Sequence, residues 1–320
     1  MDYRLRENRL KAFEDWYKWS IKYNDCDPSI YLLNYLFDRF EHNTEQKLWI
    51  CFLYGTTYYL PTAWIIWNEF PDFELVDYDR LKEWNDANYS RLRYQTDTKY
   101  NKGYLPQQFL SYKKWIESFN PSKLQLEKFN SYPENNFEIV WSEIKNNLYK
   151  FGRYSTWFYM QTLHSCANIK LEPNTLKLND YSGSKSHRNG LLYALGQDSL
   201  INAKLTNKQY SILEHKSKNI LQNINQYKKS NFYEMETVLC SFKKIFRRTR
   251  GRYLGYYLDR QAEEIKKVEL DNWTGIDWNV FWQGREECLN KKLYTSKNID
   301  KDKYNFFLDN GHFNHQELAI

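Results

Sequence analysis

The chain has 320 residues, of which 27% are charged and 42% are hydrophobic. This composition excludes an intrinsically disordered protein, and the length suits one large domain or two domains in close contact. No run approaches 18 apolar residues and the charged N-terminus lacks an apolar core, so a membrane-spanning or secreted protein is not expected. Five widely spaced cysteines form no CxxC pair, which predicts a reduced, cytoplasmic protein without disulfides or a zinc knuckle.

Charge is distributed unevenly along the chain. Residues 151–250 hold 16 Lys or Arg and 6 Asp or Glu, a balance of +10, whereas the remainder has a balance of −4. Aromatic residues make up 18% of the sequence; most must lie in the core, although such rings also stack on bases. The middle region is therefore a candidate for binding a polyanion, but a solvated lysine-rich face would give the same imbalance.

The N-terminal third predicts a succession of helices. Apolar residues recur at helical spacing over residues 5–22, and Pro28 opens a second helix. Asn43 or Thr44, followed by Glu45 and Gln46, is typical of the cap of a third helix that continues into Gly55.

The stretch from Leu53 to Phe73 is nearly apolar on all sides, which indicates burial. Pro61 suits the first position of a new helix, which Asn68 and Glu69 close. A polar pair at the end of a buried helix either pairs locally or reaches into a site. Both interpretations stay open, and Asn68 and Glu69 are candidate binding residues.

Residues 76–133 are more polar and predict short helices around Trp84 and around 110–119. Beyond them, a helix from Phe137 to Leu148 and another from Ser155 to Leu163 flank Gly152, as in a helical hairpin. We divide the chain into an N-terminal helical lobe (1–135), a basic lobe that carries the site (136–290) and a wrapping tail (291–320).

The stretch SGSKSHRNGLLYALG, residues 182–196, runs from a polar turn directly into an apolar helix. Its cations and backbone donors would gather at a helix start, where anions bind. The candidate binding residues of this turn are Ser184, Lys185, Ser186, His187, Arg188 and Asn189. His187 could instead be a structural capping residue.

A second basic stretch follows two more predicted helices, over 205–227 and 232–246, the latter with Glu236 on it. In RGRYLGYYLDRQAEEI, residues 250–265, a helix that begins near Arg252 would place Leu254, Leu258 and Ile265 toward the core. The candidate site residues here are Arg252, Tyr253, Asp259 and Arg260. Asp259 and Arg260 could equally pair with other helices.

Several common catalytic patterns are absent. The sequence has no GxxxxGK[ST] phosphate loop, no GxGxxG fingerprint, no HExxH and no alternation of strands and helices. These absences argue against a self-sufficient kinase or a Rossmann oxidoreductase, and they favour a mainly α protein.

Four segments occur in order over most of the chain: LYGTTYYLPTAWIIWNEFPDF, GRYSTW, SGSKSHRNGLLYALG and RGRYLGYYLDRQAEEI. Together they resemble a helical family of bacteriophage DNA-hypermodification proteins, the amino acid:DNA transferases, also called α-glutamyl/putrescinyl thymine pyrophosphorylases. The family is related to the helical domain of 5-hydroxymethyluracil DNA kinases. The resemblance implies a large helical, distantly DNA glycosylase-like fold, in the host cytoplasm if phage-encoded. The missing phosphate loop favours the transferase branch.

The resemblance also implies a reaction on double-stranded DNA. Pyrophosphorylated 5-hydroxymethyluracil would exchange its pyrophosphate for an amine from an amino acid or polyamine. Cations would stabilise the charge that develops on the leaving group, the candidates being Lys185, His187, Arg188, Arg153 and Arg252. The attacking amine must lose a proton, for which Asp259 is the first candidate and Glu236 and Glu69 are alternates.

A base inside a duplex is inaccessible, so the reaction would require base flipping, with Trp157, Tyr154 or Tyr253 as stacking candidates. The sequence identifies no cofactor; Mg²⁺ could bridge the pyrophosphate, but no carboxylate cluster with metal-ligand spacing is evident. The alternative function is a glycosylase-like protein that excises or binds a modified base. A non-enzymatic scaffold is a third possibility.

Overall fold

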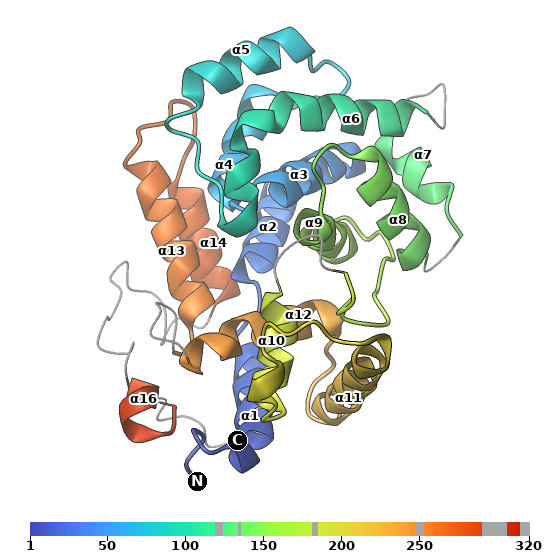
Figure 1. Ribbon diagram of the computed structural model, residues 1–320. Helices are drawn as coiled ribbons and strands as arrows, with labels where there is room; N and C mark the ends of the chain where they lie inside the picture. Colours follow the sequence, from blue (N-terminus) through green and yellow to red (C-terminus); the bar gives the residue numbers. More distant parts are fainter. Residues whose placement is uncertain (119–123, 134–135, 181–184, 247–252, 290–305, 314–320) are drawn as a thin grey trace. The chain divides into compact units, whose positions relative to one another are not determined.

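A computed structural model describes residues 1–118, 124–133, 136–180, 185–246, 253–289 and 306–313. Every regular element in these ranges is an α-helix or a 3-10 helix, and none is a strand (Figure 1). The predicted mainly α fold is thus confirmed. No helix among the described residues is both long enough and apolar enough to cross a membrane.

Each of two compact units combines segments that are distant in sequence. The first, which we name the terminal unit, comprises residues 1–28, 173–262 and 289–320. The second, the central unit, comprises residues 29–172 and 263–288. The sequence analysis expected consecutive lobes, and that three-part division stays a prediction.

The central unit holds most of the helices. In chain order, they are α2 (Pro28–Arg39), α3 (Thr44–Thr57), α4 (Leu60–Glu69), α5 (Tyr78–Asn88), the 3-10 helix η2 (Thr96–Tyr104), α6 (Leu105–Glu117), α7 (Gln125–Asn130), α8 (Phe137–Asn147), α9 (Arg153–Cys166) and α14 (Asn279–Cys288). Their interior is aromatic: Tyr112 lies against both Phe52 and Phe73, with the Phe52 and Tyr112 ring centroids 4.0 Å apart.

Local signals in the sequence account for the start and close packing of α3. The Asn43 side-chain oxygen accepts a hydrogen bond from the Gln46 backbone amide, and the Gln46 side-chain oxygen accepts one from the Asn43 backbone amide, which confirms the predicted cap. The helix continues through Gly55 because α9 lies directly against it. A Cβ at Gly55 would be 2.6 Å from the Cβ of Tyr159.

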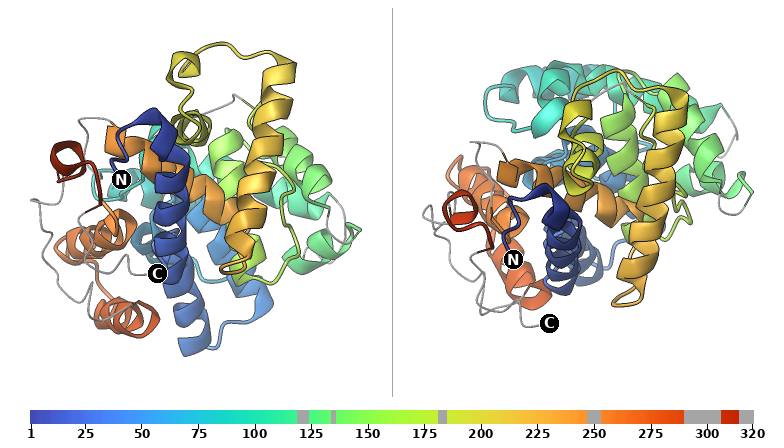
Figure 2. Two further views of the ribbon diagram at one scale, coloured as in Figure 1. Left: turned by 90° about the horizontal axis from the view of Figure 1, so that it is seen from below. Right: turned by 60° about the horizontal axis from the view of Figure 1, so that its bottom comes forward.

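The terminal unit packs three helices around a common interior: α1 (Arg9–Lys22), α10 (Ser186–Ala194) and α12 (Phe232–Phe242). Both views of Figure 2 show α1 in dark blue, beside α12 in orange. The unit also contains η1 (Arg6–Asn8), η3 (Asp198–Leu200), α11 (Asn207–Asn225), η4 (Lys243–Phe246) and the short α16 (Phe306–Asn310). Helix α13 (Tyr256–Glu269) contributes its residues 256–262.

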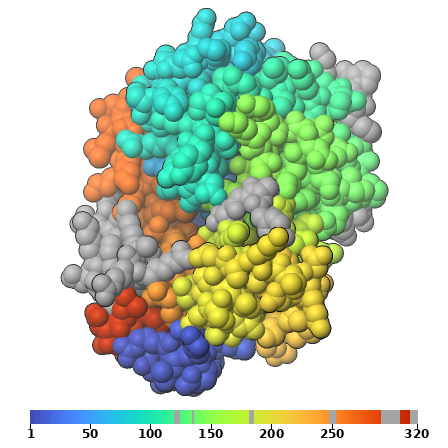
Figure 3. Space-filling view, in the orientation of Figure 1, coloured from blue at the N-terminus to red at the C-terminus, as the bar shows by residue number. Residues whose placement is uncertain are grey.

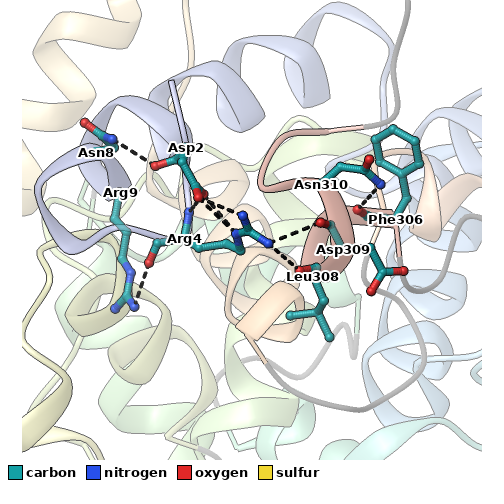
Figure 4. Close-up of polar contacts among 8 residues, drawn as sticks. All are labelled: Asp2, Arg4, Asn8, Arg9, Phe306, Leu308, Asp309 and Asn310. Atoms are coloured by element: carbon teal, nitrogen blue, oxygen red, sulfur yellow. Dashed lines mark hydrogen bonds and ion pairs between the residues drawn. The ribbon is translucent and has the colours of Figure 1, made fainter.

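Contacts between the two ends of the chain close the terminal unit. The Arg4 guanidinium donates hydrogen bonds to the carbonyl oxygens of Leu308 and Asp309, at 2.8 and 3.2 Å, in the short helix α16 (Phe306–Asn310) (Figure 4). The Tyr3 amide donates to the Gly311 carbonyl. The segment that precedes α1 in the sequence is therefore held against α16 and the residue that follows it.

Two predicted helices differ from those observed in where they begin. Residues 6–8 form a 3-10 turn, so α1 begins at Arg9 instead of residue 5. Helix α13 begins at Tyr256, after Gly255 with φ +88°, whereas the spacing of Leu254 and Leu258 predicted a start near Arg252. Arg252 itself lies outside the described residues.

Candidate active site

Close contact between α10 and α12 organises the candidate site. Gly190 of α10 faces the backbone of α12, and a Cβ at this position would overlap the carbonyl oxygen of Leu239. Only glycine allows this approach without moving a helix. His187 and Glu236 each precede the contact by three residues, which places them on the same sides of their helices.

His187 and Glu236 meet in the interior of the terminal unit. Their nearest atoms, Nδ1 and Oε1, are 3.7 Å apart, and the side chains are only 1% and 2% exposed. The two candidates named from separate stretches of sequence are therefore brought together. A buried histidine beside a carboxylate can be held in one orientation, and it can carry positive charge when protonated.

Arg188 is a buried cation that meets no carboxylate in the described part of the chain. It is 1% exposed; its Nη1 donates to the Tyr210 hydroxyl at 3.2 Å and its Nη2 approaches the Asn189 amide oxygen at 3.5 Å. Its Nε has no hydrogen-bond partner in the described part of the chain. Because guanidinium stays charged and burial removes water, this arrangement favours an incoming anion.

The start of α10 gathers further cations. Lys185 stands at the N-cap position and is exposed, and no side chain caps the helix there. The Lys243 ammonium, from η4, donates to the Ser186 hydroxyl. Asn189 donates to the Asn202 amide oxygen at 2.9 Å, which fixes the other side of the turn. Ser184, the remaining candidate of this turn, lies outside the described residues.

Asp25 holds the start of α13 from a distant part of the sequence. Its carboxylate accepts hydrogen bonds from the backbone amides of Gly255, Tyr257 and Leu258, at 2.9, 3.0 and 3.1 Å. Burial raises the pKa of Asp25 to about 7, although the three amides oppose this shift and nearby Asp259 adds to it. Sequence reasoning missed Asp25.

The second basic stretch places its described candidates beside this cap. The Tyr253 hydroxyl donates to Asp259 Oδ2 at 2.8 Å, and the two side chains are almost fully buried. The Arg260 guanidinium lies 5.0 Å from the ring centroid of Tyr257. Asp259 is thus positioned by a tyrosine, and Arg260 lies on an aromatic face.

Lys244 is a further residue that sequence reasoning missed. Its Nζ lies 3.9 Å from the ring centroid of Tyr256 and 5.0 Å from that of Tyr257. Burial lowers the pKa of Lys244 to about 7, and the positive charge of Arg260 adds to this effect. The only available signal was the pair of lysines at the end of the 232–246 helical pattern.

Two candidates, Arg153 and Trp157, lie at the start of α9 in the central unit. Arg153 is 1% exposed, and its guanidinium is 5.0 Å from the ring centroid of Trp157. The Trp157 ring is fully buried, with the rings of Phe137 and Trp141 each 6.1 Å away. This position is that of a core residue, and it gives no support to a stacking role for Trp157.

Asn68 and Glu69 end α4 in the central unit. Glu69 forms an ion pair with Arg80 at 2.9 Å, both side chains being exposed, and Asn68 is exposed next to it. Of the two interpretations left open by the sequence, local pairing describes the Glu69 contact. A role for either residue in a site stays a prediction.

Exposed lysines accompany α11 in the terminal unit. This helix, in gold, lies at the surface in Figure 3. Lys208 and Lys218 on the helix, and Lys204 and Lys229 in the flanking segments, are exposed. They account for part of the charge excess of residues 151–250 and offer contacts to a phosphate backbone. No group of three or more metal-ligating side chains occurs among the described residues.

Comparisons with known proteins agree with the resemblance noted in the sequence. A family model described as amino acid:DNA transferase matches residues 21–250. The serinyltransferase of Salmonella phage ViI is 26% identical over 329 aligned positions, which cover 93% of this chain and 78% of that protein. No solved structure matches. Because the family model covers more than half of the chain, the protein belongs to the amino acid:DNA transferases and is an enzyme that transfers an amino acid to DNA.

Proposed function

We propose that the start of α10 binds the pyrophosphate that leaves a 5-(pyrophosphoryloxymethyl)uracil base when an amino acid takes its place. The observation that carries this proposal is Arg188, a buried guanidinium that meets no carboxylate among the described residues. A lone buried charge costs several kcal/mol of solvation, which an anionic ligand would offset.

Neighbouring cations support the same assignment. Lys185 and Lys243 lie at the first turn of α10, where the helix dipole also favours negative charge. Pyrophosphate leaves with its negative charge concentrated on oxygens, and cations fixed in advance stabilise that charge in the transition state. His187, held beside Glu236, can add a further positive charge.

The DNA would reach this site with its target base flipped out of the duplex, because the methylene carbon is inaccessible within the stack. The exposed lysines of α11 would hold the phosphate backbone without reading sequence.

Serine is the first co-substrate to test, because a related protein is named a serinyltransferase. Its amino or hydroxyl group could attack the methylene carbon, and glutamate and putrescine are the other candidates.

The test is to incubate the enzyme with DNA that contains the pyrophosphorylated base and each co-substrate, and then to digest the DNA for mass spectrometry. We expect a new nucleoside whose mass equals the base with the co-substrate attached, together with one free pyrophosphate per product. Absence of any such nucleoside would refute the proposal. Abasic sites in place of a product would show the glycosylase activity considered above.

A further inference from the structure

Lys244 presents an amine that forms no ion pair with an acid among the described residues. Its Nζ forms no hydrogen bond or ion pair with any described residue and lies against the rings of Tyr256 and Tyr257. The residue is partly exposed. This position differs from that of Lys243, the adjacent residue, which donates to Ser186.

The charges around Lys244 come from each element packed against it. Arg260 on α13 and Lys243 on η4 disfavour its positive charge, whereas Cys240 on α12 and Asp25 before α2 favour it when they are ionised. Asp25 already accepts three backbone hydrogen bonds, and burial hinders its ionisation. Burial and the two cations lower the pKa of Lys244 to about 7, so its amine can be neutral at a pH where an ordinary lysine is charged.

The geometry of η4 connects Lys244 to the start of α10. Two successive lysines of this turn face different neighbours, with Lys243 at Ser186 of α10 and Lys244 at Tyr256 of α13. One turn of chain thus carries both a cation beside the leaving-group site and an unpaired amine next to it. A displacement reaction needs these two functions close together.

We propose that Lys244 is the catalytic residue that accepts the proton of the attacking amino acid. This inference rests on the function proposed above. The lone pair of the amino or hydroxyl group forms a bond to the C5-methylene carbon of the base. The carbon–oxygen bond to pyrophosphate breaks, and its electron pair leaves with the pyrophosphate. The proton of the nucleophile moves to the neutral Lys244 amine, which becomes an ammonium group.

Asp259, the candidate from the sequence, is less suited to this step. It is 8% exposed, and its Oδ2 already accepts the hydrogen bond from Tyr253. Its place near Asp25 at the start of α13 is consistent with a positioning residue. Lys244 is more accessible, and its amine needs no rearrangement of hydrogen bonds.

The test compares Lys244→Ala with Lys244→Arg in transfer of serine to the pyrophosphorylated DNA, across a pH range that brackets 7. The wild-type rate should rise as Lys244 deprotonates, with its midpoint near the pKa of about 7. Lys244→Ala should lose about 10²- to 10⁴-fold in rate together with this rise, and added methylamine should restore part of it. Lys244→Arg should be equally slow and show no rescue, because guanidinium does not release its proton.

Lys11→Ala is the matched control, since Lys11 is an exposed lysine of α1 in the same unit and belongs neither to the start of α10 nor to α11. A Lys244→Ala enzyme with the wild-type rate would overturn the inference, as would a slow one that keeps the wild-type pH profile and is not rescued.

A second test is the acetylation of the wild-type enzyme by acetic anhydride, which requires neither transfer activity nor a folded variant. Lys244 should be modified near pH 7 and protected by the DNA. Modification only above about pH 9, as for an ordinary lysine, would also overturn the inference. If the wild-type enzyme makes no product, the proposed function fails, while the acetylation still reports on Lys244.

Discussion

Replacing Arg188 by methionine tests whether this buried cation serves to bind a ligand or to stabilise the fold. The methionine side chain is neutral and unbranched and ends near the position of the Arg188 Nε, and the site is 1% exposed. Removal of a lone buried charge relieves its desolvation, which costs several kcal/mol, whereas loss of the hydrogen bond to Tyr210 costs about 1 kcal/mol. The free energy of unfolding should therefore stay the same or rise by about 1–4 kcal/mol.

Pyrophosphate should distinguish the two proteins. At a pyrophosphate concentration of about 100 times its dissociation constant, binding adds about 2.7 kcal/mol to the stability of the wild-type enzyme. Arg188→Met should lose most of this gain, and its transfer rate should fall by about 10²- to 10³-fold, as for the loss of one donor to a developing anion. Urea unfolding with and without pyrophosphate, alongside the transfer assay, measures both effects.

The control is Arg6→Met in the same unit. Arg6 pairs with Asp198 at 3.2 Å, and its side chain is 68% exposed, so its loss should change stability by no more than about 1 kcal/mol. Its response to pyrophosphate should match that of the wild type. The reasoning about Arg188 would be refuted if Arg188→Met lost about 3–5 kcal/mol, as when one partner of a buried ion pair is removed, or kept the full pyrophosphate effect.

Gly190→Ala should lower the free energy of unfolding by at least about 1–3 kcal/mol, because its Cβ would overlap the Leu239 carbonyl oxygen; urea unfolding with wild-type stability would contradict this. Asp25 has a folded-state pKa of about 7, above its ordinary 3.8, so its contribution to stability is full at low pH and is lost as pH rises through 7. The free energy of unfolding of the wild type, relative to that of Asp25→Asn, should thus decrease by as much as about 4 kcal/mol as the pH rises between those two pKa values. A difference in urea unfolding that does not change with pH would disprove this. Lys208→Ala and Lys218→Ala should each weaken DNA binding uniformly across sequences and reduce the slope of log affinity against log salt by about 1. Fluorescence anisotropy at several salt concentrations measures that slope, and unchanged slopes would exclude α11 from the DNA interface.

Features governed by neighbouring residues could be predicted from the sequence. The cap at Asn43 and the helix that begins around Pro61 depend on contacts within a few residues, and both are confirmed. The proximity of His187 to Glu236 could not be predicted, because it depends on a tertiary contact. Each was named from its own stretch, but periodicity alone does not show which helix packs on which.

Features that join distant segments could not be predicted in this way. Asp25 accepts a hydrogen bond from the Gly255 amide, 230 residues later, and no local pattern around Asp25 indicates this. Lys244 differs from an ordinary lysine through its burial and through the rings and the Arg260 charge that α13 brings to it. Trp157 was a reasonable stacking candidate by residue type, yet the fold buries it completely.

The contact of Gly190 with α12 also fixes the rotational setting of α10. Each residue turns an α-helix by about 100°, so one residue inserted between His187 and Gly190 would rotate the first turn by that angle relative to the contact. Arg188 and His187 would then point away from Tyr210 and Glu236, although the composition of the helix would hardly change. Length variation within this short interval should therefore be far more damaging to the enzyme than substitution at its exposed positions.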